Sequence, residues 1–131
     1  MFSPFHIGIY THDIDKSSEF YRAALGFSLT WRGIVHHPTG LVEAAVLRLG
    51  GMDIELVKPV DPARVHSEAG PVQHLAFMAP SLDAAIKRFN DMDIPLSSEG
   101  VEVLPDFMGG IQHCFIAGPS GERIEICEPL K

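Results

Sequence analysis

A nine-residue phrase occurs twice in this chain of 131 residues. Residues 51–59 read GMDIELVKP and residues 121–129 read GERIEICEP, so both fit Gly-x-x-Ile-Glu-(Leu/Ile)-x-x-Pro at an offset of 70 (125 − 55). In each copy a glutamate, Glu55 or Glu125, stands inside an apolar run typical of a strand. A carboxylate buried without a partner is costly, so two at matching places predict that something positive lies between them.

The repeat extends toward the start of each half. His6-Ile-Gly-Ile matches His74-Leu-Ala-Phe at an offset of 68 (74 − 6), and a segment with apolar residues at helical spacing follows each. Each half therefore predicts the order β-α-β-β-β in a single α+β domain. We expect module one at residues 1–58, a linker at 59–71 and module two at 72–131.

The expected elements follow from apolar patterning and from turn residues. Strands are predicted at residues 5–10, 27–35, 41–49, 52–57, 72–78, 101–104, 111–117 and 122–127. Helices are predicted from about residue 13 to 25, where Asp13 and Asp15 can cap the start and Gly26 the end, and from Pro80-Ser81 onward. Turns are predicted at 36–40, 50–51 and 118–121.

One histidine on the first strand and one glutamate on the fourth recur in both modules. Because side chains alternate across a strand, the isoleucines beside His6 and Glu55 can pack under the helix while these two side chains point to the opposite face. If the first and fourth strands of each module lie close together, four side chains converge: His6, Glu55, His74 and Glu125. Two imidazoles and two carboxylates suit one divalent ion such as Ni, Co, Zn, Mn or Fe, and leave room for substrate as in a catalytic site.

The alternative is that each is an ordinary strand residue, since a lone strand histidine usually lies in the core or at its rim and a lone strand glutamate on a solvated face. The repeated register favours the metal site. It does not extend to the other histidines, of which the following are expected in solvent: His12, His36, His37 and His66. His113, Tyr10, Trp31 and Met78 could line the same face, although core packing or rim exposure is the better interpretation for each of the last three.

Composition excludes several classes of protein. The net charge of −7 and the absence of a basic stripe argue against nucleic-acid binding. No apolar run is long enough for a membrane helix, and the first residues lack the basic and apolar regions of a signal peptide. Cys114 and Cys127 are predicted to be reduced core thiols, which favours the cytoplasm.

These residues resemble the vicinal-oxygen-chelate superfamily, which includes glyoxalase I, methylmalonyl-CoA epimerase, fosfomycin-resistance thiol transferases, bleomycin-binding proteins and extradiol dioxygenases. The likeness covers nearly the whole chain and is carried by residues 6–10, 20–27, 54–56, 74–77 and 119–125. It implies that the paired modules curl into a cup-shaped, partly closed β-barrel with helices outside and a divalent metal inside. It also implies a homodimer, and leaves open whether the site lies within one chain or across two.

The His-Glu-His-Glu set is most similar to that of bacterial glyoxalase I. The resemblance therefore implies a lyase or isomerase acting on a small carbonyl or thioester substrate, by proton abstraction next to a carbonyl through an enediolate. Glu125 is expected to be the base, and Glu55 a ligand or second base. An acyl-CoA epimerase, an extradiol-type dioxygenase and a small-molecule-binding resistance protein are the alternatives.

Two departures from the family pattern count against glutathione as a cosubstrate. Tyr10 stands where glutathione-using glyoxalases commonly have an arginine, and Lys58-Pro59 stands where an asparagine is common. The phrases around Glu55 and His74 look closer to the epimerase branch. That branch's additional glutamate, however, is absent from its place at Pro38-Thr39.

Overall fold

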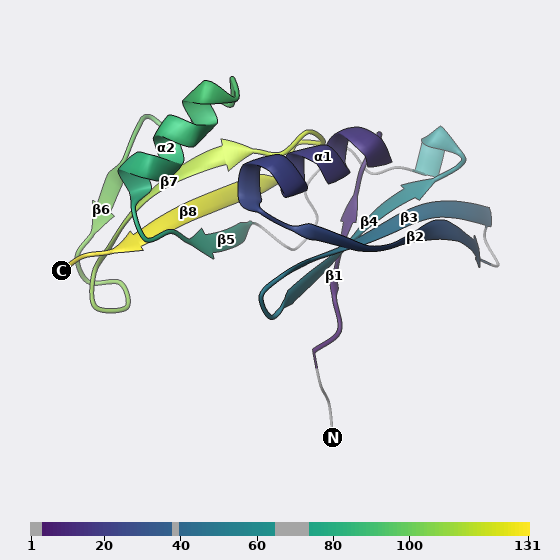
Figure 1. The fold of residues 1–131 in the computed structure, drawn as a ribbon, viewed down its shortest axis with the longest axis horizontal. Helices are drawn as coiled ribbons and strands as arrows, with labels where there is room; N and C mark the ends of the chain where they lie inside the picture. The colour runs from purple at the N-terminus through teal and green to yellow at the C-terminus, as the bar shows by residue number, and fades with distance from the viewer. Residues whose placement is uncertain (1–3, 38–39, 65–73) are drawn as a thin grey trace. The chain divides into compact units, whose positions relative to one another are not determined.

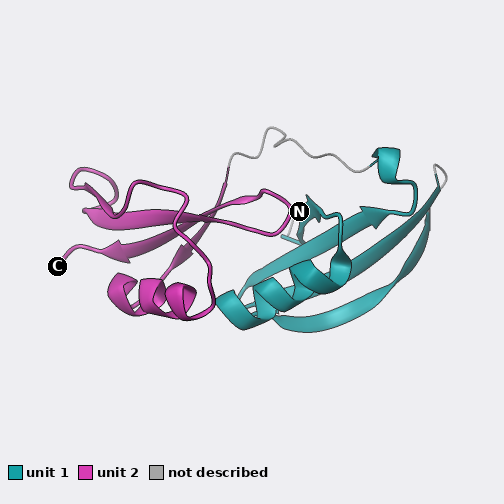
Figure 2. Ribbon diagram, turned by 90° about the horizontal axis from the view of Figure 1, so that it is seen from above, with its two compact units in different colours: residues 1–68 teal, residues 69–131 magenta. Residues whose placement is uncertain are grey.

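The computed structural model describes residues 4–37, 40–64 and 74–131. The chain divides into two compact units, Met1–Glu68 and Ala69–Lys131 (Figures 1 and 2). The first holds β1 (Ile7–Tyr10), α1 (Ile14–Leu25), β2 (Ser28–His37), β3 (Gly40–Leu49), β4 (Met52–Pro59) and the short 3₁₀ helix η1 (Pro62–Arg64). The second holds β5 (Leu75–Met78), α2 (Leu82–Asp91), β6 (Glu102–Leu104), β7 (Ile111–Ala117) and β8 (Arg123–Pro129). The expected α+β class and the repeated β-α-β-β-β order are confirmed.

Each unit contains one mixed four-stranded sheet, with the order β1-β4-β3-β2 in the first and β5-β8-β7-β6 in the second. The first and fourth strands of each unit run parallel, and the other neighbours run antiparallel. Gly8 pairs with Glu55 across β1 and β4, and Ala76 pairs with Glu125 across β5 and β8. The sequence repeat is therefore also a repeat of strand register.

Both helices begin where side-chain oxygens can satisfy the free backbone N–H groups of the first turn. Asp13 accepts a hydrogen bond from the backbone N–H of Lys16 at 3.0 Å, and Ser81 does the same for Ala84 at 3.2 Å. Helix α1 ends at Gly26, whose φ of 84° is the left-handed conformation that glycine adopts without strain. These are the start and end that the sequence predicts for α1.

Each helix covers one face of its own sheet and encloses a small apolar core. In the first unit Tyr21 of α1 packs edge-on against Phe27, and both are buried together with Ile54 and Leu56 of β4. In the second unit the buried core includes Leu82 and Phe89 of α2, Cys114 and Ile116 of β7, and Ile124 and Ile126 of β8. The isoleucines and leucine on either side of each strand glutamate thus face the helix.

The structure differs from the sequence prediction in where some strands end. Residues 36–40 were expected to form a turn with His36 and His37 in it, but β2 continues to His37 and β3 begins at Gly40. Cross-strand pairing of His37 with Gly40 extends the hairpin through positions whose composition indicated a turn. In the predicted linker, Pro59 belongs to β4, and His66 lies outside the described residues.

The strand expected at 72–78 begins at Leu75, with His74 directly before it, and residues 72 and 73 lie outside the described part of the chain. No helix among the described residues is long and apolar enough to cross a membrane.

A buried pair of hydroxyl groups joins the end of β1 to α1. Thr11 and Ser17 are both fully buried, and their side-chain oxygens lie 2.6 Å apart. The Thr11 hydroxyl also accepts a hydrogen bond from the backbone N–H of Asp13 at 3.1 Å. Burying such groups is tolerated only while their hydrogen bonds are made.

We expect Thr11→Val to lower the free energy of unfolding by about 1–3 kcal/mol, because it deprives the buried Ser17 hydroxyl of its partner. Urea denaturation followed by circular dichroism measures the change. Adding Ser17→Ala to Thr11→Val should restore part of the loss, since the unsatisfied hydroxyl is then gone. A double variant that loses the sum of the two single losses would contradict this account.

Candidate functional site

The first unit brings His6 and Glu55 into direct contact. Glu55 lies between Ile54 and Leu56, which are fully buried under α1, so its own side chain points to the other face of the sheet. His6 stands two residues before Gly8, the register partner of Glu55. Its Nε2 lies 3.2 Å from Glu55 Oε1, and both side chains are about one quarter exposed, at 28% and 26%. The pair is close enough to share a ligand and open enough to receive one.

An apolar row continues from Glu55 across the same face. Val46 of β3 pairs with Glu55, and Trp31 of β2 pairs with Val46, so the three side chains lie side by side on successive strands. Gly33 makes room for the indole, because a Cβ at that position would lie 2.7 Å from Trp31 Cζ2. Trp31 and Tyr10 are both exposed. This face therefore presents aromatic surface next to a carboxylate.

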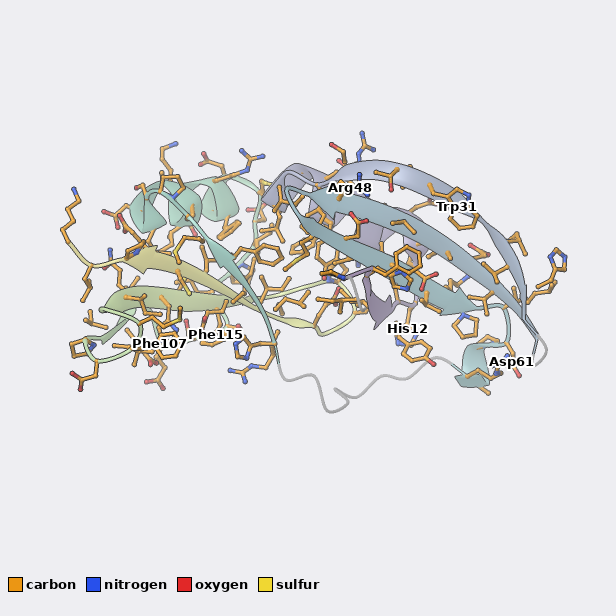
Figure 3. The ribbon with its side chains drawn as sticks, turned by 90° about the horizontal axis from the view of Figure 1, so that it is seen from below. His12, Trp31, Arg48, Asp61, Phe107 and Phe115 are labelled. Carbon is orange, nitrogen blue, oxygen red and sulfur yellow. The ribbon has the colours of Figure 1, made fainter. Side chains whose placement is uncertain are left out.

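The second unit repeats the placement of the histidine and the glutamate. Glu125 lies between Ile124 and Ile126, which are buried, and His74 stands two residues before Ala76, the register partner of Glu125. Phe115 pairs with Glu125 across β7 and β8, and lies on the side of the sheet away from α2 (Figure 3). Its ring centre is 6.0 Å from that of His74. Both predicted site residues of this unit thus belong to the face opposite the helix.

Glu125 has two further partners, His113 and Cys127, whose contacts with it the sequence pattern does not predict. His113 Nδ1 lies 2.9 Å from Glu125 Oε2, and the Cys127 thiol donates a hydrogen bond to Oε1 at 3.0 Å. Cys127 follows Glu125 by two residues, so alternation along the strand predicts that the two side chains share a face. His113 joins them because it is the register partner of Cys127. Finding His113 requires knowing how β7 and β8 pair, which the spacing along the chain alone does not fix.

These neighbours change the acidity of the groups. Burial raises the pKa of Glu125, but the hydrogen bonds from Cys127 and His113 and the charges of His113 and His74 outweigh it, so the pKa lies below its ordinary value. Burial, together with the hydrogen bond to Glu125 and the negative charge there, raises the pKa of Cys127 to about 12. At neutral pH Glu125 is therefore ionised and Cys127 is a neutral thiol.

Each unit contributes one imidazole and one carboxylate, and these are donor types that suit a divalent transition-metal ion. Among the described residues, no group of three or more His, Cys, Asp and Glu side chains is placed to hold an ion by itself. His6 and Glu55 are in contact, and His74 and Glu125 occupy the equivalent positions of the second unit, with His74 two residues before the register partner of Glu125. That all four side chains coordinate one ion stays a prediction.

The chain belongs to the glyoxalase/bleomycin resistance protein/dioxygenase superfamily, whose family model matches residues 5–115. The match includes His6, Glu55 and His74 and ends in β7, before Glu125. The resemblance identified from the sequence is thereby confirmed.

Individual relatives agree with this membership. An uncharacterized protein of Bacillus subtilis is 29% identical over 128 residues, covering 94% of both chains. A protein of Arabidopsis thaliana named glyoxylase I 4 is 28% identical over 93% of this chain and 68% of its own length. The crystal structure of a glyoxalase family protein from Bacillus cereus superposes with a TM-score of 0.80 at 20% identity, covering 100% of this chain and 96% of that one, which shows the shared fold.

Both cysteines should be slow to react in the folded protein. Cys114 and Cys127 are free and buried, and with a pKa of about 12 only about one Cys127 thiol in ten thousand is ionised at pH 8. We expect native protein at pH 8 to release almost no thionitrobenzoate from dithionitrobenzoate within minutes, and unfolded protein in urea to release two per chain. A thiol that titrates rapidly before urea is added would contradict the placement of these residues.

Proposed function

We propose that the protein is a metal-dependent lyase or isomerase of the glyoxalase I type, which moves a proton next to a carbonyl group of a small substrate. The observation that supports this most is the repeated register: in each unit a histidine directly precedes the first strand, β1 or β5, and a glutamate lies on the parallel fourth strand, β4 or β8. Family membership and the similarity to the Arabidopsis protein are consistent with this chemistry.

His6, Glu55, His74 and Glu125 are the residues that would hold one Ni, Co, Zn, Mn or Fe ion. Such an ion, when bound, polarises a carbonyl and stabilises the negative charge that develops as the neighbouring carbon loses its proton. We further propose that the two sheets form the cup-shaped, partly closed barrel typical of the family. The site would be completed within one chain or between two chains of a cytoplasmic homodimer.

Glu125 is the residue we assign to proton transfer. Its pKa lies below the ordinary value, so at neutral pH its carboxylate is ready to accept a proton from the carbon next to the carbonyl. Returning that proton to the adjacent carbon completes an isomerisation, and returning it to the opposite face of the same carbon would be an epimerisation. Glu55, in contact with His6, serves as a ligand.

The surroundings of Glu55 favour a substrate with an apolar part over one held by glutathione. Tyr10 lies on the same face of the sheet as Glu55, and its phenol group has no positive charge with which to bind a carboxylate of glutathione. Lys58 belongs to the opposite face, where its Nζ lies 3.8 Å from Glu43. Trp31 and Tyr10 instead supply exposed aromatic surface.

Metal content tests the assignment first. We expect purified, untagged protein to contain about one transition-metal ion per chain by elemental mass spectrometry, and the double variant Glu55→Gln/Glu125→Gln to lose it. Addition of Ni²⁺ or Co²⁺ to metal-free protein should also quench the fluorescence of the single tryptophan, Trp31, whose strand is two strand spacings, about 10 Å, from that of Glu55.

Glu43→Gln is the matched control, because Glu43 is a strand glutamate on the opposite face of the same sheet. It should keep both the metal and the quenching. A wild-type protein that stays free of metal after each ion is added back would contradict the catalytic proposal and leave a binding protein of this family. Oxygen uptake with ferrous iron would instead identify a ring-cleaving oxygenase.

Loss of the base should separate turnover from metal binding. We expect Glu125→Gln to lower kcat by about 10²–10⁴-fold on hemithioacetal or acyl-CoA substrates, because glutamine cannot accept the proton. Steady-state kinetics and elemental analysis of the same preparation measure both quantities. Full turnover by Glu125→Gln with metal still bound would show that another group is the base.

A further inference from the structure

His113 is a buried side chain whose contacts the proposed function leaves unexplained. Only 8% of its side chain is exposed, and its Nδ1 lies 2.9 Å from Glu125 Oε2. Because an ionised carboxylate can only accept hydrogen bonds, this contact requires the tautomer of His113 in which Nδ1 carries a proton and donates a hydrogen bond to Glu125. The Cys127 thiol donates to the other oxygen at 3.0 Å. Both oxygens of Glu125 are therefore held by neighbours that belong to its own sheet.

In the first unit Glu55 contacts His6, but the positions equivalent to His113 and Cys127 offer it no hydrogen-bonding group. His113 pairs with Cys127 across β7 and β8, and the equivalent pair across β3 and β4 is Ala44 and Val57. Neither of these side chains can form a hydrogen bond. The two glutamates, which the sequence repeat makes nearly interchangeable, therefore differ in the side chains that border them.

Two further side chains border the His113 ring, those of Glu102 and Phe115. Its Nε2 lies 3.6 Å from Oε2 of Glu102, its register partner on β6, and finds no hydrogen-bond partner among the residues described. The ring of Phe115 packs against it at 5.3 Å between centres, with an angle of 64° between the ring planes. A ring confined in this way gives its Nδ1–H a defined direction, so it can define the direction of the carboxylate as well.

We infer that His113 is a positioning residue that fits Glu125, rather than Glu55, to act as the base. This inference rests on the proposed function. With His113 and Cys127 each using one lone pair, Glu125 keeps one free direction on each oxygen. Holding the carboxylate in one orientation reduces the entropy lost when it meets the proton of the substrate, so the effect falls on turnover more than on binding.

A pair of substitutions at residue 113 tests this role. His113→Phe fills the volume of the ring without a donor, whereas His113→Asn places an amide N–H near the position of Nδ1. We expect His113→Phe to lower kcat by about 10–100-fold while KM and metal content stay close to those of the wild type. His113→Asn should recover most of the lost kcat. Circular dichroism confirms that both variants are folded.

Several outcomes would overturn the inference. If His113→Phe loses metal as the double glutamine variant does, His113 is a ligand. If both variants lower kcat equally, its effect does not pass through the hydrogen bond, and if neither lowers kcat it has no role in turnover.

A measurement without substrate separates failure of this inference from failure of the proposed function. If the wild type turns over none of the substrates offered, the proposed function fails, and long-range ¹H–¹⁵N spectra of histidine-labelled protein then decide on His113. A proton on Nδ1 of His113, with a signal that moves in Glu125→Gln, supports the positioning contact. An unprotonated Nδ1 excludes it.

Discussion

The parallel pairing of the first and fourth strands is the constraint on which the candidate site depends. It pairs Gly8 with Glu55 and Ala76 with Glu125, so that His6 and His74 stand at equivalent places, each two residues before the partner of a glutamate. In the first unit this brings His6 into contact with Glu55. Burial of Ile54 and Ile124 against the helices fixes which face each glutamate takes, because a shift by one residue would turn the carboxylate into the core. The same apolar contacts that fold each unit therefore also position its histidine and its glutamate.

Much of this arrangement could be predicted from the sequence because its signals are local or repeated. The ends of α1 follow from Asp13 and Gly26, which act within a few residues of themselves. The sheet face of Glu55 and Glu125 follows from period-two alternation, and the equivalence of the two halves from two matching offsets. The strand limits near His37 and Gly40 could not be predicted, because cross-strand pairing there prevails over turn-forming composition.

The contact between His113 and Glu125 lay beyond sequence reasoning for a different reason. The two residues are 12 positions apart on separate strands, and their contact depends on the register of a hairpin that places His113 opposite Cys127. The repeat gave no help, since Ala44 occupies the equivalent place in the first unit. The two halves therefore share the positions of a histidine and a glutamate, whereas the side chains next to each glutamate differ. Equal positions in the repeat need not carry equal roles.

The most direct test of the central claim is anomalous diffraction from crystals grown with Co²⁺, recorded at the cobalt absorption edge. A shared metal site predicts one strong peak for each chain, about 2.0–2.3 Å from side-chain atoms of all four residues, His6, Glu55, His74 and Glu125. The four ligands would come from one chain or from two. A peak held by one of the two pairs alone, a peak only at other histidines, or no peak at all would contradict a shared metal site.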